Sequence, residues 1–310
     1  MKPARRILFR VLFYCGLWLA VCAAIGIVLG EAALHPPRLP IGPDDEAMAR
    51  SEAARNRAAL ADVELRAADG AILRGWSIRA AAGNGNAVIL LHGQADNRRG
   101  MLAPADLLLR HGYSVLLPDA RAHGASGGSI ATYGLLESGD LRRWAVWLEL
   151  SQAPHCLYGL GDSMAASQLL ESLTQIPEFC AVVAESAFSS FREAAYVRIG
   201  QQFRTGPWLG QTLLRPAIEE GLLYARLRYG VNFAMASPIR AVASTRVPVL
   251  LIHGLADTNL PPRNSERIKA ANAAAVLWEP PDAGHCGASS AEPAEYERRV
   301  IGWFESHAGH

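Results

Sequence analysis

Three side chains that lie far apart in the chain, Ser163, Asp257 and His285, each follow a predicted buried strand. A serine hydroxyl is a weak nucleophile near neutral pH, so it requires a base that accepts its proton and a third group that orients the base. The imidazole of His285 suits the first task, and the carboxylate of Asp257 suits the second. The three residues therefore predict nucleophilic attack on an acyl carbonyl.

Ser163 lies in the sequence GDSMA, between a predicted apolar strand and a predicted helix. This sequence is a G-x-S-x-A variant of the nucleophile elbow, a sharp strand-to-helix turn that presents the serine hydroxyl at the edge of a sheet. The small residues Gly161 and Ala165 permit this crowded turn, although Ala165 replaces the more common glycine. We assign Gly161 and Asp162 supporting roles in the turn. The alternative interpretation is that Ser163 only caps the following helix.

The negatively charged oxygen formed during attack requires hydrogen-bond donors, and two backbone N–H groups are the candidates for this oxyanion hole. One belongs to Met164, the residue after the serine. The other belongs to Gln94, in the loop that follows the apolar sequence AVILLH. His92 and Gly93 precede Gln94, and we interpret His92 as a residue that shapes this loop, since it has no proton to move there.

The elements that must position these residues can be read from the hydrophobic pattern. Two alternating runs around Asp69-Gly70 predict a β-hairpin. After it, apolar segments of strand length alternate with helical patterns; they cover residues 87–92, 113–119, 156–161, 180–185, 247–253 and 275–280. Continuous apolar strands indicate a mostly parallel sheet with helices on both faces, an α/β fold.

Polar residues occur where these strands end: Gln94, Asp119, Ser163, Glu185, Asp257 and His285. Sheets of this kind bind ligands beyond the carboxyl ends of their strands, so we expect these side chains to converge. Glu185 is the reserve candidate for the acid that orients His285.

Residues 188–240 interrupt the alternation of strands and helices with helical segments rich in aromatic residues. This pattern predicts a helical cap. The cap could act as a lid with an apolar substrate surface, or its aromatic side chains could form only its own core, which is the interpretation that we favour.

Residues 11–30 form an uncharged apolar segment whose length of twenty matches the ~30 Å hydrocarbon core of a bilayer. Four basic residues precede it: Lys2, Arg5, Arg6 and Arg10. We therefore expect a single-pass anchor with residues 1–10 in the cytoplasm and the main domain outside, in the periplasm if the organism is a bacterium. The alternative is a cleaved signal peptide, although its apolar region is usually only about 7–15 residues long.

A linker at residues 31–60 joins the anchor to the predicted hydrolytic domain at 61–310. The linker begins with a proline-rich stretch, and residues 44–62 predict a short polar helix. Within the domain, Cys156 and Cys180 each begin a predicted strand. An oxidising compartment would permit a bridge between them, and buried free cysteines are the alternative.

Composition bounds the partners of the chain. The net charge is +1 and the pI is about 7.7, so no basic face indicates binding to nucleic acid. We find no zinc-type spacing of Cys and His and no phosphate-binding loop, and Met164 replaces the third small residue of a dinucleotide fingerprint. We expect no metal and no organic cofactor, and the oligomeric state is not predicted.

Five motifs carry a resemblance to a known family: HGQADN (92–97), DARAHGASGG (119–128), GDSMA (161–165), HGLADTNLPP (253–262) and AGHCG (283–287). From about residue 62 to 308 the chain resembles the α/β-hydrolase superfamily, in which the chain order is serine, acid, histidine. It is similar to membrane-anchored serine hydrolases of the α/β-hydrolase-domain type. The resemblance implies an α/β-hydrolase fold and the hydrolysis of an ester, thioester or amide. It also implies that Asp119, Arg121 and His123 belong to a structural loop near the site.

We therefore expect a membrane-anchored extracytoplasmic serine hydrolase that acts on a small-molecule acyl substrate, with carboxylic esters or thioesters preferred. One alternative is a peptidase or amidase with the same triad, in which Glu219 and Glu220 of the cap could bind a substrate amino group. Another alternative is a non-catalytic scaffold with this fold, and the complete triad disfavours it.

Overall fold

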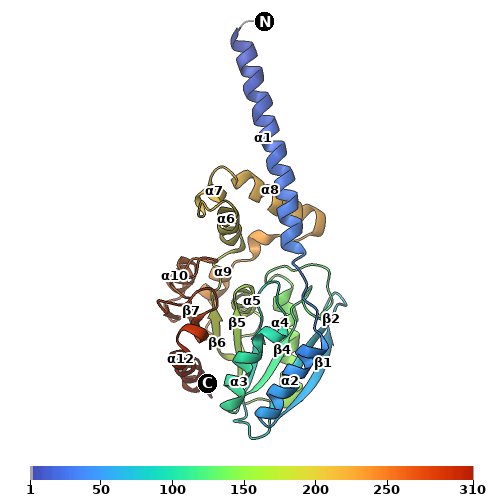
Figure 1. Cartoon of the computed structure of the whole chain (residues 1–310), viewed down its shortest axis with the longest axis vertical. Helices are drawn as coiled ribbons and strands as arrows, with labels where there is room; N and C mark the ends of the chain where they lie inside the picture. Colours follow the sequence, from blue (N-terminus) through green and yellow to red (C-terminus); the bar gives the residue numbers. More distant parts are fainter. Residues whose placement is uncertain (1–2, 310) are drawn as a thin grey trace. The chain divides into compact units, whose positions relative to one another are not determined.

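The computed structural model of the protein describes residues 3–309 and divides the chain into two compact units. One unit, here called the cap unit, combines the N-terminal helix α1 (Pro3–Leu34) with the segment Phe191–Met235. The other unit contains the rest of the chain and holds the whole sheet. Each unit is described by itself below (Figure 1).

The sheet unit is built on eight strands in the order β1-β2-β4-β3-β5-β6-β7-β8. The strands are β1 (Ala58–Arg66), β2 (Ile72–Ala80), β3 (Ala87–Leu91), β4 (Ser114–Pro118), β5 (Leu157–Asp162), β6 (Phe179–Glu185), β7 (Val249–Ile252) and β8 (Val276–Trp278). The first two strands form the expected antiparallel hairpin, and all pairs from β4 to β8 are parallel. The predicted mostly parallel α/β sheet is confirmed.

Helices connect these strands and cover both faces of the sheet. They are α2 (Pro43–Arg55), the short η1 (Arg98–Met101), α3 (Leu102–Arg110), α4 (Glu137–Gln152), α5 (Met164–Ser172), α9 (Pro238–Ser244), α10 (Arg263–Ala271), α11 (Ala288–Ala291) and α12 (Pro293–Ser306). The chain leaves β3 toward β4 on one side and then crosses to β5 on the other side. The carboxyl ends of β3 and β5 therefore form a topological switch point, where such sheets bind ligands.

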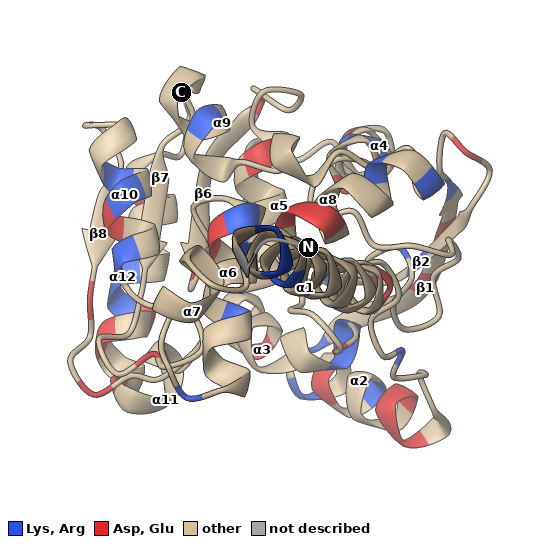
Figure 2. Cartoon of the chain, turned by 90° about the horizontal axis from the view of Figure 1, so that it is seen from above, with Lys and Arg blue, Asp and Glu red and all other residues tan. Residues whose placement is uncertain are grey.

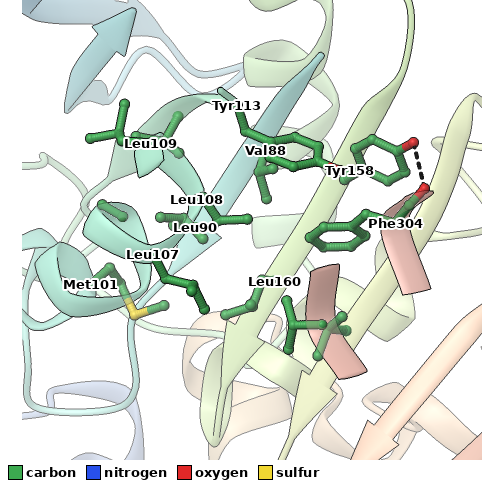
Figure 3. Packing of buried hydrophobic residues seen from close by; sticks show 14 of the residues in the cluster. Val88, Leu90, Met101, Leu107, Leu108, Leu109, Tyr113, Tyr158, Leu160 and Phe304 are labelled. Carbon is green, nitrogen blue, oxygen red and sulfur yellow. Dashed lines mark hydrogen bonds between the residues drawn. The ribbon is translucent and has the colours of Figure 1, made fainter. Parts of the chain in front are cut away.

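The period of two along each strand divides the core between the two faces of the sheet. Val88 and Leu90 of β3 pack with α3 and α12 on one face, whereas Ile89 packs with α4 and α5 on the other. Figure 3 shows the first of these clusters, in which the ring of Tyr158 lies 4.5 Å from that of Phe304 and its hydroxyl donates a hydrogen bond to the Phe304 carbonyl at 2.9 Å. A sheet buried on both faces is a rigid support for its loops.

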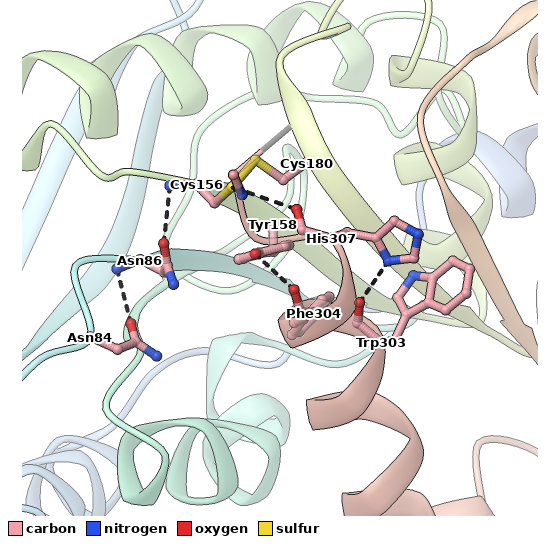
Figure 4. The surroundings of a disulfide bond; sticks show 9 residues. Asn84, Asn86, Cys156, Tyr158, Cys180, Trp303, Phe304 and His307 are labelled. Atoms are coloured by element: carbon pink, nitrogen blue, oxygen red, sulfur yellow. Dashed lines mark hydrogen bonds between the residues drawn. A yellow bond between two sulfur atoms is a disulfide. The ribbon is translucent and has the colours of Figure 1, made fainter.

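A disulfide joins Cys156 and Cys180, so these two cysteines are bridged rather than free (Figure 4). Cys156 immediately precedes β5, and Cys180 is the second residue of β6. Because β5 and β6 are neighbouring parallel strands, the bridge clamps their amino ends together, at the edge of the sheet opposite the carboxyl ends.

The polar helix of the linker, α2, is shorter than predicted. It ends at Arg55, and strand β1 already begins at Ala58, whereas we expected the helix to continue to residue 62. Arg57 has a φ of 51°, which ends the helix, and Ala58 to Asp62 then pair with β2 in register with Ala80 to Trp76. Pairing with a distant strand overrides the local helical preference of this alanine-rich segment.

The cap unit is helical. Besides α1 it contains α6 (Phe191–Gln202), α7 (Trp208–Gln211), α8 (Arg215–Tyr229) and the short η2 (Phe233–Met235). Helix α1 lies against α8, as Figure 1 shows. Several of the aromatic side chains pack within the unit: Phe191 stacks on Phe233 at 4.2 Å between ring centroids, and Tyr196 belongs to an apolar cluster with Ile199.

Candidate active site

Ser163 lies at the tight turn between β5 and α5. Its φ is 55° and its ψ is −114°, a conformation that is rare for a residue with a side chain. A Cβ atom on Gly161 would lie 2.9 Å from the carbonyl oxygen of Ala165, so only glycine fits there. The backbone N–H of Ser163 donates to the Glu185 carbonyl at 2.8 Å, which ties the turn to β6. The turn is the strained strand-to-helix geometry expected of GDSMA.

The structure brings Ser163, His285 and Asp257 together in one hydrogen-bonded row. The Nε2 atom of His285 lies 2.7 Å from Oγ of Ser163, and its Nδ1 atom lies 2.7 Å from Oδ2 of Asp257. Because a carboxylate only accepts, Nδ1 carries the proton, and Nε2 of the neutral imidazole is free to accept the proton of the serine. The side chain of His285 is 22% exposed and that of Asp257 is fully buried, so only the histidine end of the pair is open to water.

Asp257 is held as a carboxylate by its hydrogen bonds. Its Oδ1 atom accepts the backbone N–H groups of Asn259 and Leu260 at 2.8 and 2.9 Å. Burial acts to raise the pKa of Asp257, but hydrogen bonds from His253, His285 and Leu260 outweigh it and lower the pKa well below its ordinary value. Its negative charge is therefore present throughout the physiological range, and it stabilises a protonated His285.

His253 is a second imidazole on the same carboxylate, and the sequence analysis gave it no role. It is fully buried, and its Nε2 atom lies 2.8 Å from the Leu260 carbonyl and 3.3 Å from Oδ2 of Asp257. Nε2 must carry a proton to bind the carbonyl, so Nδ1 accepts the hydroxyl of Ser265 at 2.7 Å. Its place four residues before Asp257 in HGLADTNLPP was the available signal.

The loop after β3 carries the first candidate oxyanion donor. The Nε2 atom of His92 accepts the backbone N–H of Ala120 at 3.1 Å, so its Nδ1 donates to the Gly93 carbonyl at 2.8 Å. The C=O and N–H of one trans peptide point in opposite directions, so this bond turns the Gln94 N–H away from the imidazole. A Cβ atom on Gly93 would lie 3.5 Å from the Cβ of Ser163, which places the loop beside the serine.

His92 itself is buried and neutral. Burial lowers its pKa below the ordinary value of 6.5, although the negative charge of Asp119 opposes this effect. Its two ring nitrogens are both engaged with backbone groups. These two contacts link the loop after β3 to the loop after β4.

The second candidate donor is the backbone N–H of Met164. Met164 is the first residue of α5, so its N–H has no acceptor inside the helix. The amino end of a helix also carries a partial positive charge, which favours an anion at this position. The side-chain amide of Gln94 is not part of this arrangement, because it donates to the hydroxyl of Tyr133 at 2.9 Å.

The loop after β4 is braced by buried polar side chains. Asp119 accepts the backbone N–H of Ala125 at 2.7 Å, and Arg121 binds both carboxylate oxygens of Asp140 at 2.7 and 2.9 Å. The Nδ1 atom of His123 lies 2.9 Å from the carbonyl of Arg121. The bonds of Asp119, Arg121 and His123 hold the loop together.

Two further carboxyl groups lie at the ends of β5 and β6. Asp162 pairs with Glu185 in the sheet register, and Glu185 accepts the backbone N–H of Ala288 at 2.9 Å. Burial raises the pKa of Glu185 to about 7. Burial also raises the pKa of Asp162 well above its ordinary value, with Glu185 and Asp96 adding to the effect. Asp257 contacts His285, so Glu185 is not needed as the acid of the row.

Cys286, beside His285, is a partly buried thiol. Its backbone N–H donates to the hydroxyl of Ser186 at 3.1 Å, and burial raises the pKa of the thiol. Within residues 3–309, no group of three or more His, Cys, Asp or Glu side chains is placed to hold a metal ion.

Comparison with known proteins identifies the fold family. Residues 88–299 match the model of the "Alpha/beta hydrolase family". The chain belongs to this family. Esterase Pf2001 of Pyrococcus furiosus has a similar structure, with a TM-score of 0.68 and 26% identity, over 89% of this chain and 99% of the esterase. An acylaminoacyl peptidase of Pyrococcus horikoshii shares the fold, with a TM-score of 0.61 and 18% identity, over 81% of this chain and 42% of the peptidase.

Two relatives of this hydrolase in sequence are uncharacterized proteins. YqkD of Bacillus subtilis is 29% identical over 59% of this chain, and the match spans 59% of its own length. Rv2307c of Mycobacterium tuberculosis is 30% identical, over 68% of this chain and 67% of its own length. Outside the match to the family lies α1, the one described helix that is long and apolar enough to be a membrane anchor or a signal sequence.

Proposed function

We propose that this hydrolase cleaves carboxylic esters or thioesters of small molecules through a serine nucleophile. The observation that carries the proposal is the row of two 2.7 Å hydrogen bonds that joins Ser163, His285 and Asp257. The row contains a nucleophile, a base that can accept its proton, and a buried anion that stabilises the charged base.

In the proposed reaction, Oγ of Ser163 attacks the substrate carbonyl and its proton passes to Nε2 of His285. The carbonyl oxygen becomes an anion and accepts hydrogen bonds from the backbone N–H groups of Gln94 and Met164. The protonated His285 then donates its proton to the leaving alcohol or thiol as the carbon–oxygen or carbon–sulfur bond breaks. Water attacks the acyl-enzyme with His285 again as base, which releases the acid and restores Ser163.

Esters are favoured over amides by the likeness to an esterase over nearly its whole length. The acylaminoacyl peptidase supports only the shared fold, because its identity is 18%. Glu219, one of the two candidate anchors for a peptide amino group beside Glu220, accepts hydrogen bonds from Arg192 and Tyr196 at 3.1 and 3.0 Å. The carboxylate of Glu219 is therefore already engaged, which weakens the case for Glu219 as that anchor.

We also propose that α1 anchors the hydrolase in a membrane and that the sheet unit lies on the extracytoplasmic side. The Cys156–Cys180 disulfide supports this location, since such bridges persist in oxidising compartments. The basic residues before the apolar segment support the same orientation.

A fluorophosphonate probe tests the nucleophile, because it reacts only with an activated serine. We expect labelling of the wild type and of Ser290→Ala, which removes an exposed serine, and no labelling of Ser163→Ala. Labelling that persists in Ser163→Ala, or folded wild type that never labels, would contradict the assignment, and the second result would favour a scaffold.

The bond preference is tested on paired substrates. We expect p-nitrophenyl esters and the corresponding thioesters to be hydrolysed at least tenfold faster than aminoacyl anilides of similar size. A tenfold ratio of rates corresponds to a difference of about 1.4 kcal/mol in the barrier. Faster cleavage of the anilides would replace the esterase by a peptidase with the same triad.

A further inference from the structure

The cap unit carries a large share of the exposed apolar side chains. Outside α1, half of the exposed large hydrophobic residues of the described chain lie in the short segment Phe191–Met235. They are Phe203, Trp208, Leu213, Leu223, Leu227 and Met235. Trp208 begins α7, Phe203 precedes this helix and Leu213 follows it, and the three side chains are 55 to 62% exposed. We call Phe203, Trp208 and Leu213 the cap edge. Exposed apolar side chains that gather on one small unit are unusual for a surface that faces water, and they indicate a surface that another apolar phase covers.

The position of the cap edge along α1 follows from how α1 packs on α8. The two helices approach closely because their contact is lined by glycines: a Cβ atom on Gly26 would lie 2.5 Å from the Ala217 carbonyl, and one on Gly30 would lie 3.2 Å from the Gly221 carbonyl. Further along, the hydroxyl of Tyr229 donates to Glu31 at 2.8 Å. The helices therefore run in the same direction.

This direction sets the level of the cap edge. Leu213 precedes α8, so it lies nearer the N-terminal end of α1 than the level of Gly26, which contacts Ala217 of α8. Trp18 and Leu29 of α1 both pack against the cluster that contains Leu214 and Ile218, so this cluster lies beside residues 18–29 of α1. Leu209, which follows Trp208, packs against the same cluster, so the cap edge at Trp208 and Leu213 lies beside the apolar segment of α1.

Trp18 lies well inside the apolar segment. From Arg10, the last basic residue before this segment, eight residues at 1.5 Å each place Trp18 about 12 Å along a hydrocarbon core that is ~30 Å thick, and nineteen residues place Leu29 about 28 Å along it. The part of α1 that packs against the cap unit therefore extends into the half of the core farther from Arg10. Sliding the helix until Trp18 reached the outer boundary would draw Arg10 and the arginines before it into the core, where charged groups are the costliest to insert. If α1 spans a bilayer, the chain near Trp18 is surrounded by lipid.

We propose that the cap edge inserts into the lipid bilayer, in the leaflet on the side of the sheet unit, so that the hydrolase is seated in the membrane by its cap as well as by α1. The inference rests on α1 lying in a bilayer. The bilayer is the occupant that we choose over a second copy of the chain, because it covers the exposed face of α1 and the cap edge at the same level.

The residues around the cap edge have the chemistry of a membrane interface. Tryptophan and arginine are typical of this layer, because both have an apolar body and a polar end. Exposed Arg204 directly follows Phe203, and exposed Arg215 follows Leu213 by two residues. The segment 191–235 contains six arginines against three glutamates, a balance that attracts anionic headgroups. Figure 2 shows further basic residues of the cap unit at the N-terminal end of α1.

The test uses the full chain, one molecule per nanodisc, in lipids brominated on the acyl chains near the headgroups. The fluorescence of Trp208 is obtained as the difference between the wild type and Trp208→Phe. The matched control is Trp147→Phe, which removes a partly exposed tryptophan of α4. We expect brominated lipid to remove roughly half or more of the Trp208 signal, as for a side chain 5–10 Å below the surface, and to leave the Trp147 signal unchanged.

Two outcomes overturn the proposal. Trp208 that is quenched by soluble acrylamide but not by brominated lipid lies in water, and Trp208 that is shielded from both is covered by protein. A third difference, between the wild type and Trp18→Phe, reports on α1 itself. If brominated lipid quenches Trp18 but not Trp208, α1 is a membrane anchor but the cap edge is not inserted in the bilayer. A Phe203→Trp reporter in the Trp208→Phe background should show the same quenching by brominated lipid, which extends the test to a second position.

Discussion

Replacing Asp257 with asparagine tests the proposed triad through the proton on His285. Oδ1 of Asp257 accepts two backbone N–H groups, from Asn259 and Leu260, at 2.8 and 2.9 Å. An asparagine must keep its carbonyl oxygen there, because the opposite orientation would set an NH₂ group against two backbone donors. Its NH₂ group therefore takes the place of Oδ2, which lies 2.7 Å from Nδ1 of His285.

This exchange reverses the direction of the hydrogen bond. Nδ1 of His285 must now accept, so the proton of the neutral imidazole moves to Nε2, which faces the hydroxyl of Ser163. That tautomer has no lone pair to take the serine proton. In a serine protease the same substitution lowers kcat by about 10⁴, which corresponds to about 5.5 kcal/mol in the barrier. We expect a loss of this order in kcat, with KM changed by less than about threefold.

The assay is the initial rate of p-nitrophenyl ester hydrolysis over a range of ester concentrations, with the melting temperature measured in parallel. The control is Glu185→Gln, which removes the carboxylate at the end of β6, and it should keep kcat within about tenfold of the wild type because this group does not contact the imidazole. If Asp257→Asn kept most of its activity while Glu185→Gln abolished it, the acid of the triad would be Glu185 and the reasoning would be refuted.

Three further predictions concern residues around the site. His253→Phe removes the second imidazole donor to Asp257, and the loss of a hydrogen bond to a charged group, ~1.5–3 kcal/mol, should lower kcat about tenfold to hundredfold with little change in KM; unchanged kinetics would make His253 purely structural. The double variant Cys156→Ala/Cys180→Ala opens a loop of 24 residues and should lower the free energy of unfolding in urea by about 3 kcal/mol without changing kcat/KM. Glu185 has a folded pKa of about 7 against an ordinary 4.5, so charging it in the folded state costs about 3 kcal/mol. The stability of the wild type relative to Glu185→Gln should therefore be fully present below pH 4.5 and be lost as the pH rises to about 7, whereas exposed Glu149→Gln should follow the wild type at every pH.

The convergence of the triad was predictable because it depends on a general property of parallel sheets. Ser163, Asp257 and His285 each follow an apolar run, and the apolar runs are readable as strands without any tertiary information. Parallel strands bring their carboxyl ends to one edge, so residues in these positions meet whatever the exact path of the helices. The crowded turn at Ser163 was also visible, since the small residues around it are required locally.

Other features depended on partners that no local pattern specifies. The polar helix gives way to β1 at Ala58 because this segment pairs with β2, and its own alanines favour the helix. The bridge between Cys156 and Cys180 requires that β5 and β6 be neighbours, which strand order decides. His253 acts on Asp257 only because the turn between them folds back, so that its ring also reaches the Leu260 carbonyl.

The amino-acid sequence by itself determined the kind of protein this is: an α/β hydrolase with a serine, an acid and a histidine in order, and an apolar helix before them. These properties depend on residue types and on their periodicity, which can be read without any tertiary structure. Only the tertiary structure decided which carboxylate meets the imidazole, which ring nitrogen carries its proton, and how α1 is matched in register to α8. Those outcomes depend on distances of a few ångströms between residues far apart in the chain, and packing alone sets such distances.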